Sequence, residues 1–154
     1  MGFLDKMTSA ITGVNDETNA ANKQKMRELF NSVVKDGDSY KVIATYGQKI
    51  NPLIKRTTYY SYIVGYKGEG ELVIVPCNSE LTDASNPIAV TPANCTVKKS
   101  LTGETVFTSD VFEKGKVSMI ASAGPVAKGY VIMVIQGPEE ISALDQFIKT
   151  YYKK

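Results

Sequence analysis

The chain has 154 residues, of which 43% are hydrophobic and 22% charged, and its 18 basic and 16 acidic side chains leave a formal net charge of +2. This size and composition predict one globular domain, and the nearly balanced charge excludes the basic footprint of a nucleic-acid binder. The sequence contains no histidine. It therefore lacks the side chain most used for proton transfer and metal binding near neutral pH, and we expect no catalytic residue, metal or cofactor.

The first 36 residues have helical periodicity and are predicted to form an N-terminal helical extension. Near its start, an apolar stripe at helical spacing consists of Phe3, Leu4, Met7 and Ile11. Membrane-surface helices usually carry a strongly basic polar face, whereas this one has Asp5 beside Lys6. We therefore expect the stripe to pack on its own domain or on a second copy, giving a homo-oligomer, with membrane contact as the alternative.

A second helical pattern follows within the same extension. Its apolar positions are Met26, Leu29, Phe30, Val33 and Val34. Asn15 or Asp16 is suited to cap its start, and 36–38, Asp-Gly-Asp, is suited to end it.

From Tyr40 the pattern changes to short runs rich in Val, Ile, Thr and Tyr, which predict strands. The expected strands are 40–46, 57–66, 71–77, 88–90, 95–101, 105–109, 116–121 and 129–136, with 47–52 as a loop. Three hairpins are predicted, formed by 57–66 with 71–77, by 95–101 with 105–109, and by 116–121 with 129–136. Successive hairpins without intervening helices indicate an antiparallel meander that must close or stack to bury its apolar face.

The end of the chain predicts an amphipathic helix over 138–152. Pro138 fits the first turn, and Glu139 and Glu140 complement the positive end of the helix dipole. The apolar stripe is formed by Ile141, Leu144, Ile148 and Tyr151. This face is too apolar to remain in water, so the helix should belong to the core.

This order of elements resembles the pleckstrin-homology-like superfold, particularly the bacterial pleckstrin-homology domains. The resemblance implies a mainly β, α+β fold: a seven-strand, strongly bent antiparallel barrel with a C-terminal helix that caps one open corner. Strands would come from 40–109 and 116–136 and the capping helix from 138–152. Residues 40–154 would form the single barrel domain, and residues 1–36 would be an addition to the family pattern.

The resemblance also suggests a candidate ligand site, because lipid-binding members place basic residues around the loop between their first two strands. The matching stretch, 48–56, contains Lys49, Lys55 and Arg56, which could contact an anionic ligand. The family pattern has basic residues at alternate positions of a strand, which share one face. Lys55 and Arg56 are adjacent and would point in opposite directions on a strand. An ordinary solvated loop is therefore the alternative.

Three functions remain open at this point. We expect a non-enzymatic interaction module that binds a protein or peptide. The first alternative is a peripheral phospholipid-binding domain that uses 49–56 and the N-terminal helix, and the second is a small enzyme or ligand-binding barrel with an unrecognised pocket. An exposed apolar groove would favour the first function, a basic concavity beside 49–56 the second, and a deep polar pocket with a buried lysine the third.

The N-terminus and the cysteines bear on the cellular location. The N-terminus lacks the continuous apolar core of a signal peptide, and no apolar run is long enough to span a membrane. Cys77 and Cys95 lie at the edges of predicted strands, where either a disulfide or two buried free thiols is conceivable. We expect free thiols in a reducing compartment and a cytoplasmic protein.

Overall fold

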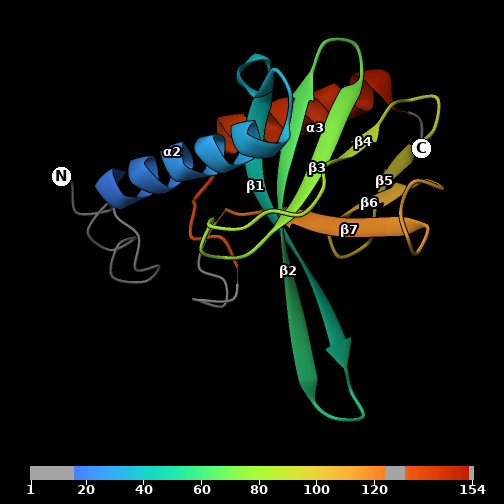
Figure 1. The fold of residues 1–154 in the computed structure, drawn as a ribbon. Helices are drawn as coiled ribbons and strands as arrows, with labels where there is room; N and C mark the ends of the chain where they lie inside the picture. The colour runs from blue at the N-terminus through green and yellow to red at the C-terminus, as the bar shows by residue number, and fades with distance from the viewer. Residues whose placement is uncertain (1–15, 124–130, 153–154) are drawn as a thin grey trace.

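The computed structural model describes residues 16–123 and 131–152. Helix α2 (Asp16–Val33) precedes seven strands, and helix α3 (Pro138–Tyr151) follows them. The strands are β1 (Lys41–Asn51), β2 (Arg56–Lys67), β3 (Glu71–Cys77), β4 (Ile88–Val90), β5 (Thr96–Lys99), β6 (Thr105–Thr108) and β7 (Lys116–Ala121). They form one antiparallel sheet in the order β4-β3-β2-β1-β7-β6-β5, curled into a half-barrel (Figure 1). The predicted α+β fold class is confirmed.

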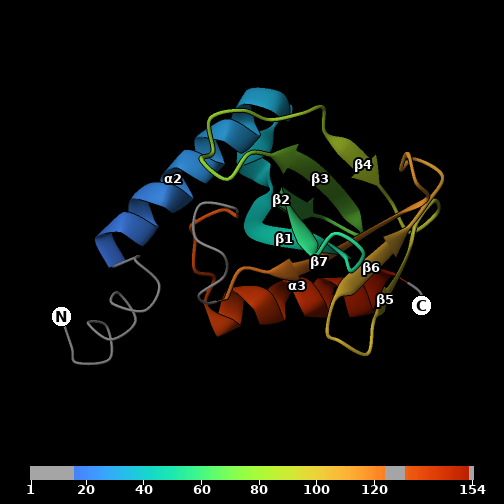
Figure 2. The same cartoon turned by 90° about the horizontal axis from the view of Figure 1, so that it is seen from below.

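The two helices cover opposite faces of the sheet (Figure 2). Side chains alternate between the faces along each strand. Ile43 and Val64 therefore belong to the core cluster that includes Leu144 of α3. Their neighbours Ala44 and Ile63 belong to a second cluster that includes Phe30 of α2. Each face of the central hairpin is thus closed by one helix.

Helix α2 confirms the second helical pattern of the sequence and packs directly on the sheet. Phe30 is fully buried, and its ring lies against the backbone of Gly65 on β2, where a side chain would collide with it. The helix ends at Val33, and Asp36 adopts the left-handed conformation with φ 57°. The apolar stripe of residues 3–11 lies outside the described residues, so its packing and its role in self-association stay predictions.

Helix α3 confirms the predicted C-terminal helix, one residue shorter at its end. A carboxylate oxygen of Glu140 accepts a hydrogen bond of 2.8 Å from the backbone N–H of Gly137 and so caps the first turn. Leu144 is buried, and Ile141 and Ile148 pack on the same cluster. Just beyond the helix, the hydroxyl of Tyr152 donates a hydrogen bond to the carbonyl of Gly70 in the β2–β3 turn. The helix is therefore part of the core, as its stripe predicted.

Two of the three predicted hairpins are confirmed, and a further hairpin lies where a loop was expected. Strand β2 pairs with β3 from Ser61 to Lys67, and β5 pairs with β6 along its whole length. The prediction of a loop over 47–52 is wrong, because β1 continues to Asn51 and forms a long hairpin with β2. Gly47 is needed for close approach rather than for a turn: a Cβ there would lie 2.7 Å from the carbonyl oxygen of Ser118.

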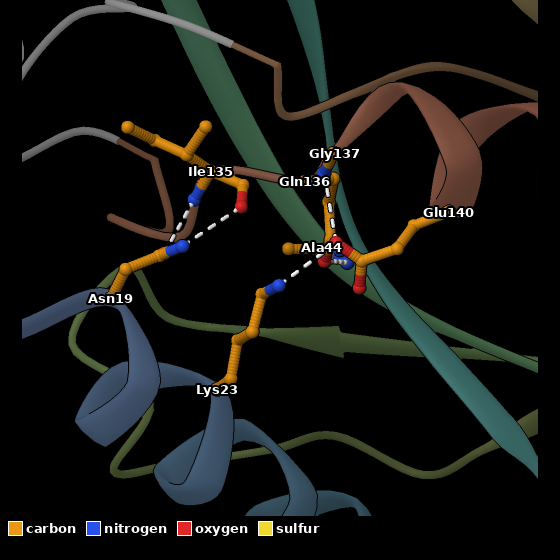
Figure 3. Close-up of polar contacts among 7 residues, drawn as sticks. All are labelled: Asn19, Lys23, Ala44, Ile135, Gln136, Gly137 and Glu140. Atoms are coloured by element: carbon orange, nitrogen blue, oxygen red, sulfur yellow. Dashed lines mark hydrogen bonds and ion pairs between the residues drawn. The ribbon is translucent and has the colours of Figure 1, made fainter. Parts of the chain in front are cut away.

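The third predicted hairpin, between 116–121 and 129–136, is wrong in the described part of the chain. Residues 131–136 are not assigned to a strand, and β7 pairs with β1 and β6 instead. The segment is held by α2, where the side-chain amide of Asn19 both donates to the carbonyl of Ile135 and accepts from its N–H, at 3.0 and 2.8 Å (Figure 3). The apolar run at 131–134 therefore reflects burial beneath α2 rather than strand pairing.

Candidate functional site

The β1–β2 hairpin extends well beyond the rest of the sheet (Figure 1). Strand β7 pairs with β1 only at Thr45 and Tyr46, and the ladder between β2 and β3 ends at Ser61. Beyond these points, residues 47–51 and 56–60 pair only with each other within the described chain. The distal half of the hairpin is thus a two-stranded ribbon that no other strand of the described chain extends.

The end of this ribbon, residues 49–56, is called the hairpin tip here. It exposes three large apolar side chains: 93% of Leu53 and 63% each of Ile50 and Ile54. The side-chain oxygen of Asn51 accepts a hydrogen bond of 3.1 Å from the N–H of Leu53, which holds the turn. Single exposed apolar residues are ordinary, but three within five positions on a projecting turn form a patch that suits contact with another apolar surface.

The three predicted basic residues all lie at the hairpin tip and are exposed. Lys49 is opposite Thr58, and Asn51 is opposite Arg56. Lys49 and Arg56 therefore share one face of the ribbon, diagonally adjacent, within reach of a common anion. Lys55 lies in the turn with φ 50°, so the objection that Lys55 and Arg56 would point in opposite directions along a strand does not apply. No acidic residue occurs between positions 47 and 60.

A groove lies at the base of the hairpin, between its inner face and the β6–β7 loop. Its volume is about 560 Å³, and its apolar lining includes Tyr60, Tyr62, Ile88, Phe112 and Val117. The charged residues around it are Lys49, Lys114, Lys116 and Glu113. Burial, and secondarily the proximity of Tyr60, raises the pKa of Tyr62, so its hydroxyl stays neutral at physiological pH. The groove continues the apolar and cationic character of the tip into the body of the protein.

No family model matches the chain, and neither a curated protein nor a solved structure matches it significantly. The function must therefore follow from the residues themselves. Among the described residues, no cluster of His, Cys, Asp or Glu is suited to hold a metal ion. No described helix is both long and apolar enough to cross a membrane.

The two cysteines are free thiols, as expected. Cys77 is half-buried beside the groove, and burial raises its pKa to about 12. Because the thiolate is the reactive form, Cys77 is a poor nucleophile at neutral pH. Burial likewise raises the pKa of Cys95. Neither thiol supplies the groove with an activated group.

The apolar part of the tip was missed from the sequence, although a signal was present. Ile50, Leu53 and Ile54 fall in a short stretch flanked by Lys49 on one side and Lys55-Arg56 on the other. Once 47–51 is placed on a strand, these residues occupy the end of a ribbon with no partner to cover them. The other predicted contact residues, Phe3, Leu4, Met7 and Ile11, lie outside the described residues.

Proposed function

We propose that the protein is a non-enzymatic module that binds an anionic membrane surface through its hairpin tip. The observation that carries this proposal is the pairing of exposed apolar side chains with three cations, and no acid, at the end of a projecting ribbon. Apolar side chains favour the boundary between headgroups and acyl chains, and cations favour anionic headgroups. The tip offers both on a structure narrow enough to enter that boundary.

The expected binding is reversible and needs both kinds of contact. Each Lys or Arg near an anionic surface contributes about 1 kcal/mol. Full burial of a Leu or Ile side chain contributes about 1.5–3 kcal/mol, and shallow insertion contributes less. Part of this sum offsets the freedom that the protein loses on association. Tyr59 and Tyr60, next along β2, suit the polar interface because each combines an apolar ring with a hydroxyl.

Two further expectations fit this proposal. The strand order β4-β3-β2-β1-β7-β6-β5, followed by a helix, supports membership of the pleckstrin-homology-like superfold. A cytoplasmic location would place the hairpin tip beside the leaflet that carries most of the anionic lipid. The unpaired thiols are compatible with the reducing conditions of that compartment.

Vesicle co-sedimentation tests the proposal. The full-length chain should sediment with vesicles of phosphatidylcholine mixed with phosphatidylserine, and much less with vesicles of phosphatidylcholine alone. Added salt should weaken binding because it screens the headgroup attraction. The double variant L53S/I54S should lose most of the binding although every charge is retained. The double variant K49A/R56A should lose it although the apolar tip is retained.

The matched control is Leu101→Ser. Leu101 is even more exposed than Leu53, at 108% against 93%, but it lies in the turn between β5 and β6. This variant should bind like the parent. Equal binding to neutral and anionic vesicles would contradict the proposal, as would a tip variant that binds like the parent. If Leu101→Ser lost as much vesicle binding as L53S/I54S, exposed apolar residues would contribute wherever they lie. The hairpin tip would then have no special role in binding.

A further inference from the structure

The groove at the base of the hairpin is an opening in the hydrophobic core. Its lining includes buried Phe112, a member of the core cluster on which α3 packs, and three partly buried residues that pack against the same cluster: Tyr62, Ile88 and Val117. These four residues are called the groove floor here. No residue of α3 lines the groove, so the helix leaves this part of the cluster open. A ligand with an apolar body would remove these core side chains from water.

Three lysines lie around the groove floor. Lys49 is two positions from Gly47, which is paired with Tyr60, so all three residues share the inner face of the hairpin. Lys114 and Lys116 belong to the β6–β7 loop and to the first residue of β7, and both are exposed. The lining contains one acidic residue, Glu113. The rim of the groove therefore favours an anionic group.

Several polar side chains of the lining face away from the groove or are already paired. Gln48, Ser61 and Ser118 each adjoin an inward-facing residue along their strand, so their side chains point to the opposite face of the sheet. Asn78 is held by the loop that follows it: its side-chain oxygen accepts from two N–H groups at 3.0 and 3.1 Å, and its amide donates to a hydroxyl at 2.7 Å. A ligand of this groove therefore needs an apolar body that makes few hydrogen bonds.

We propose that the groove binds one long-chain fatty acid, with its acyl chain on the groove floor and its carboxylate among Lys49, Lys114 and Lys116. The groove volume of about 560 Å³ lies within the range of about 300–1,000 Å³ that is usual for small-molecule sites. Each CH₂ group of the chain that is buried should strengthen binding about fourfold. Charge-assisted hydrogen bonds from the lysine ammonium groups would hold the carboxylate.

A second copy of this chain is a poorer occupant of the groove. The exposed apolar side chains of its hairpin tip are accompanied by three cations, which would approach the lysines around the groove. The groove is also separate from the apolar tip, because none of Ile50, Leu53 and Ile54 lines it. Fatty-acid binding therefore does not rest on membrane binding, and either one can fail without the other.

Isothermal titration calorimetry of the full-length chain tests the proposal without vesicles. The probes are saturated fatty acids from octanoate to tetradecanoate, each kept below the concentration at which it forms micelles. Affinity should rise about fourfold with each added CH₂ group and then level off once the acyl chain fills the groove. The double variant L53S/I54S should bind dodecanoate like the parent, although it loses vesicle binding under the proposed function.

Lys116→Glu and its matched control Lys98→Glu test the cationic rim. Both residues are exposed lysines on strands, but Lys98 lies on β5 and does not line the groove. Lys116→Glu should weaken dodecanoate binding by about three- to tenfold, because it replaces an exposed attraction with a repulsion. Lys98→Glu makes the same change in net charge and should bind like the parent.

A measurement on the unmodified chain places the ligand without relying on any variant. In two-dimensional NMR spectra, dodecanoate should shift the backbone amide resonances of Ile88 and Val117 and leave those of Leu53 and Ile54 unchanged. The proposal is overturned if dodecanoate does not bind or shifts the tip resonances instead. It is also overturned if affinity does not depend on chain length, if it rises through the whole series without levelling off, or if the two lysine variants weaken binding equally. Vesicle binding without dodecanoate binding would leave the proposed function standing and remove this inference alone.

Discussion

The contact between Phe30 and Gly65 fixes α2 on the sheet, and a single methyl group should test it. An ideal Cβ on Gly65 would lie 2.3 and 2.7 Å from two ring carbons of Phe30. Carbon atoms pack at about 3.5–4.0 Å, so the ring would have to move by about 1 Å or more. Phe30 is 0% exposed, so its ring can move only by displacing the residues that surround it. The backbone of Gly65 has no positive φ, so alanine itself is not strained there.

We therefore expect Gly65→Ala to lower the free energy of unfolding by about 1–3 kcal/mol, as overpacking of a core does. Urea titrations followed by circular dichroism would measure it. A double-mutant cycle with Phe30→Leu is the control. The smaller side chain leaves room for the methyl group, so Gly65→Ala should cost about 0.5–3 kcal/mol less in that background. A stable Gly65→Ala variant, or strictly additive effects in the cycle, would refute the packing of α2 described above.

Two further predictions concern α3. Leu144→Ala should lower the free energy of unfolding by about 2–5 kcal/mol in the same urea assay, because the side chain is buried among both sheet and helix residues. An unchanged unfolding transition would contradict the capping role of α3. Burial of Glu140 opposes its ionisation, but the hydrogen bonds from Lys23 and from the Gly137 N–H outweigh it and lower its pKa. The ionised carboxylate therefore stabilises the fold above its unfolded pKa of about 4.3, and this contribution is lost as the pH falls through the lower folded pKa. Glu140→Gln should lower the free energy of unfolding at pH 7 by about 1 kcal/mol or less, because Lys23 and Glu140 are both partly exposed. This difference from the parent should shrink in acid. A difference that does not change with pH would count against the Lys23–Glu140 pair.

The parts of the fold that the sequence predicts are those governed by neighbouring residues. The β2–β3 hairpin can be predicted because glycines at 68 and 70 lie between two apolar runs, and both have positive φ in the turn. The β5–β6 hairpin has Gly103 in the same role. Helix α3 follows from Pro138 and the acids of its first turn. In each case the deciding interaction spans a few residues and leaves a pattern that can be read locally.

The errors arise where a distant contact decides the local structure. Gly47 indicates a turn in the sequence, but it serves the close approach of Ser118. The apolar run at 131–134 indicates a strand, but the Asn19 amide, 116 positions away from Ile135, takes the place of a neighbouring strand. These contacts exist only after the sheet has curled, so local periodicity carries no trace of them. The apolar tip was missed for the same reason, since its exposure depends on where β7 and β3 stop pairing with the hairpin.

The β1–β2 ribbon and the edge strand β5 share a chemical feature. Unpaired strand edges favour pairing with other chains, and charged side chains, lysine above all, discourage it. The ribbon at the hairpin carries Lys49 and Arg56 on one face, and β5 carries Lys98 and Lys99. Pairing between copies at these edges would bring cations together. Under the proposed function, the cations at the tip also attract an anionic bilayer. Cations at the tip can therefore disfavour pairing between copies and favour an anionic surface, and replacing Lys49 and Arg56 with neutral residues should weaken both properties together.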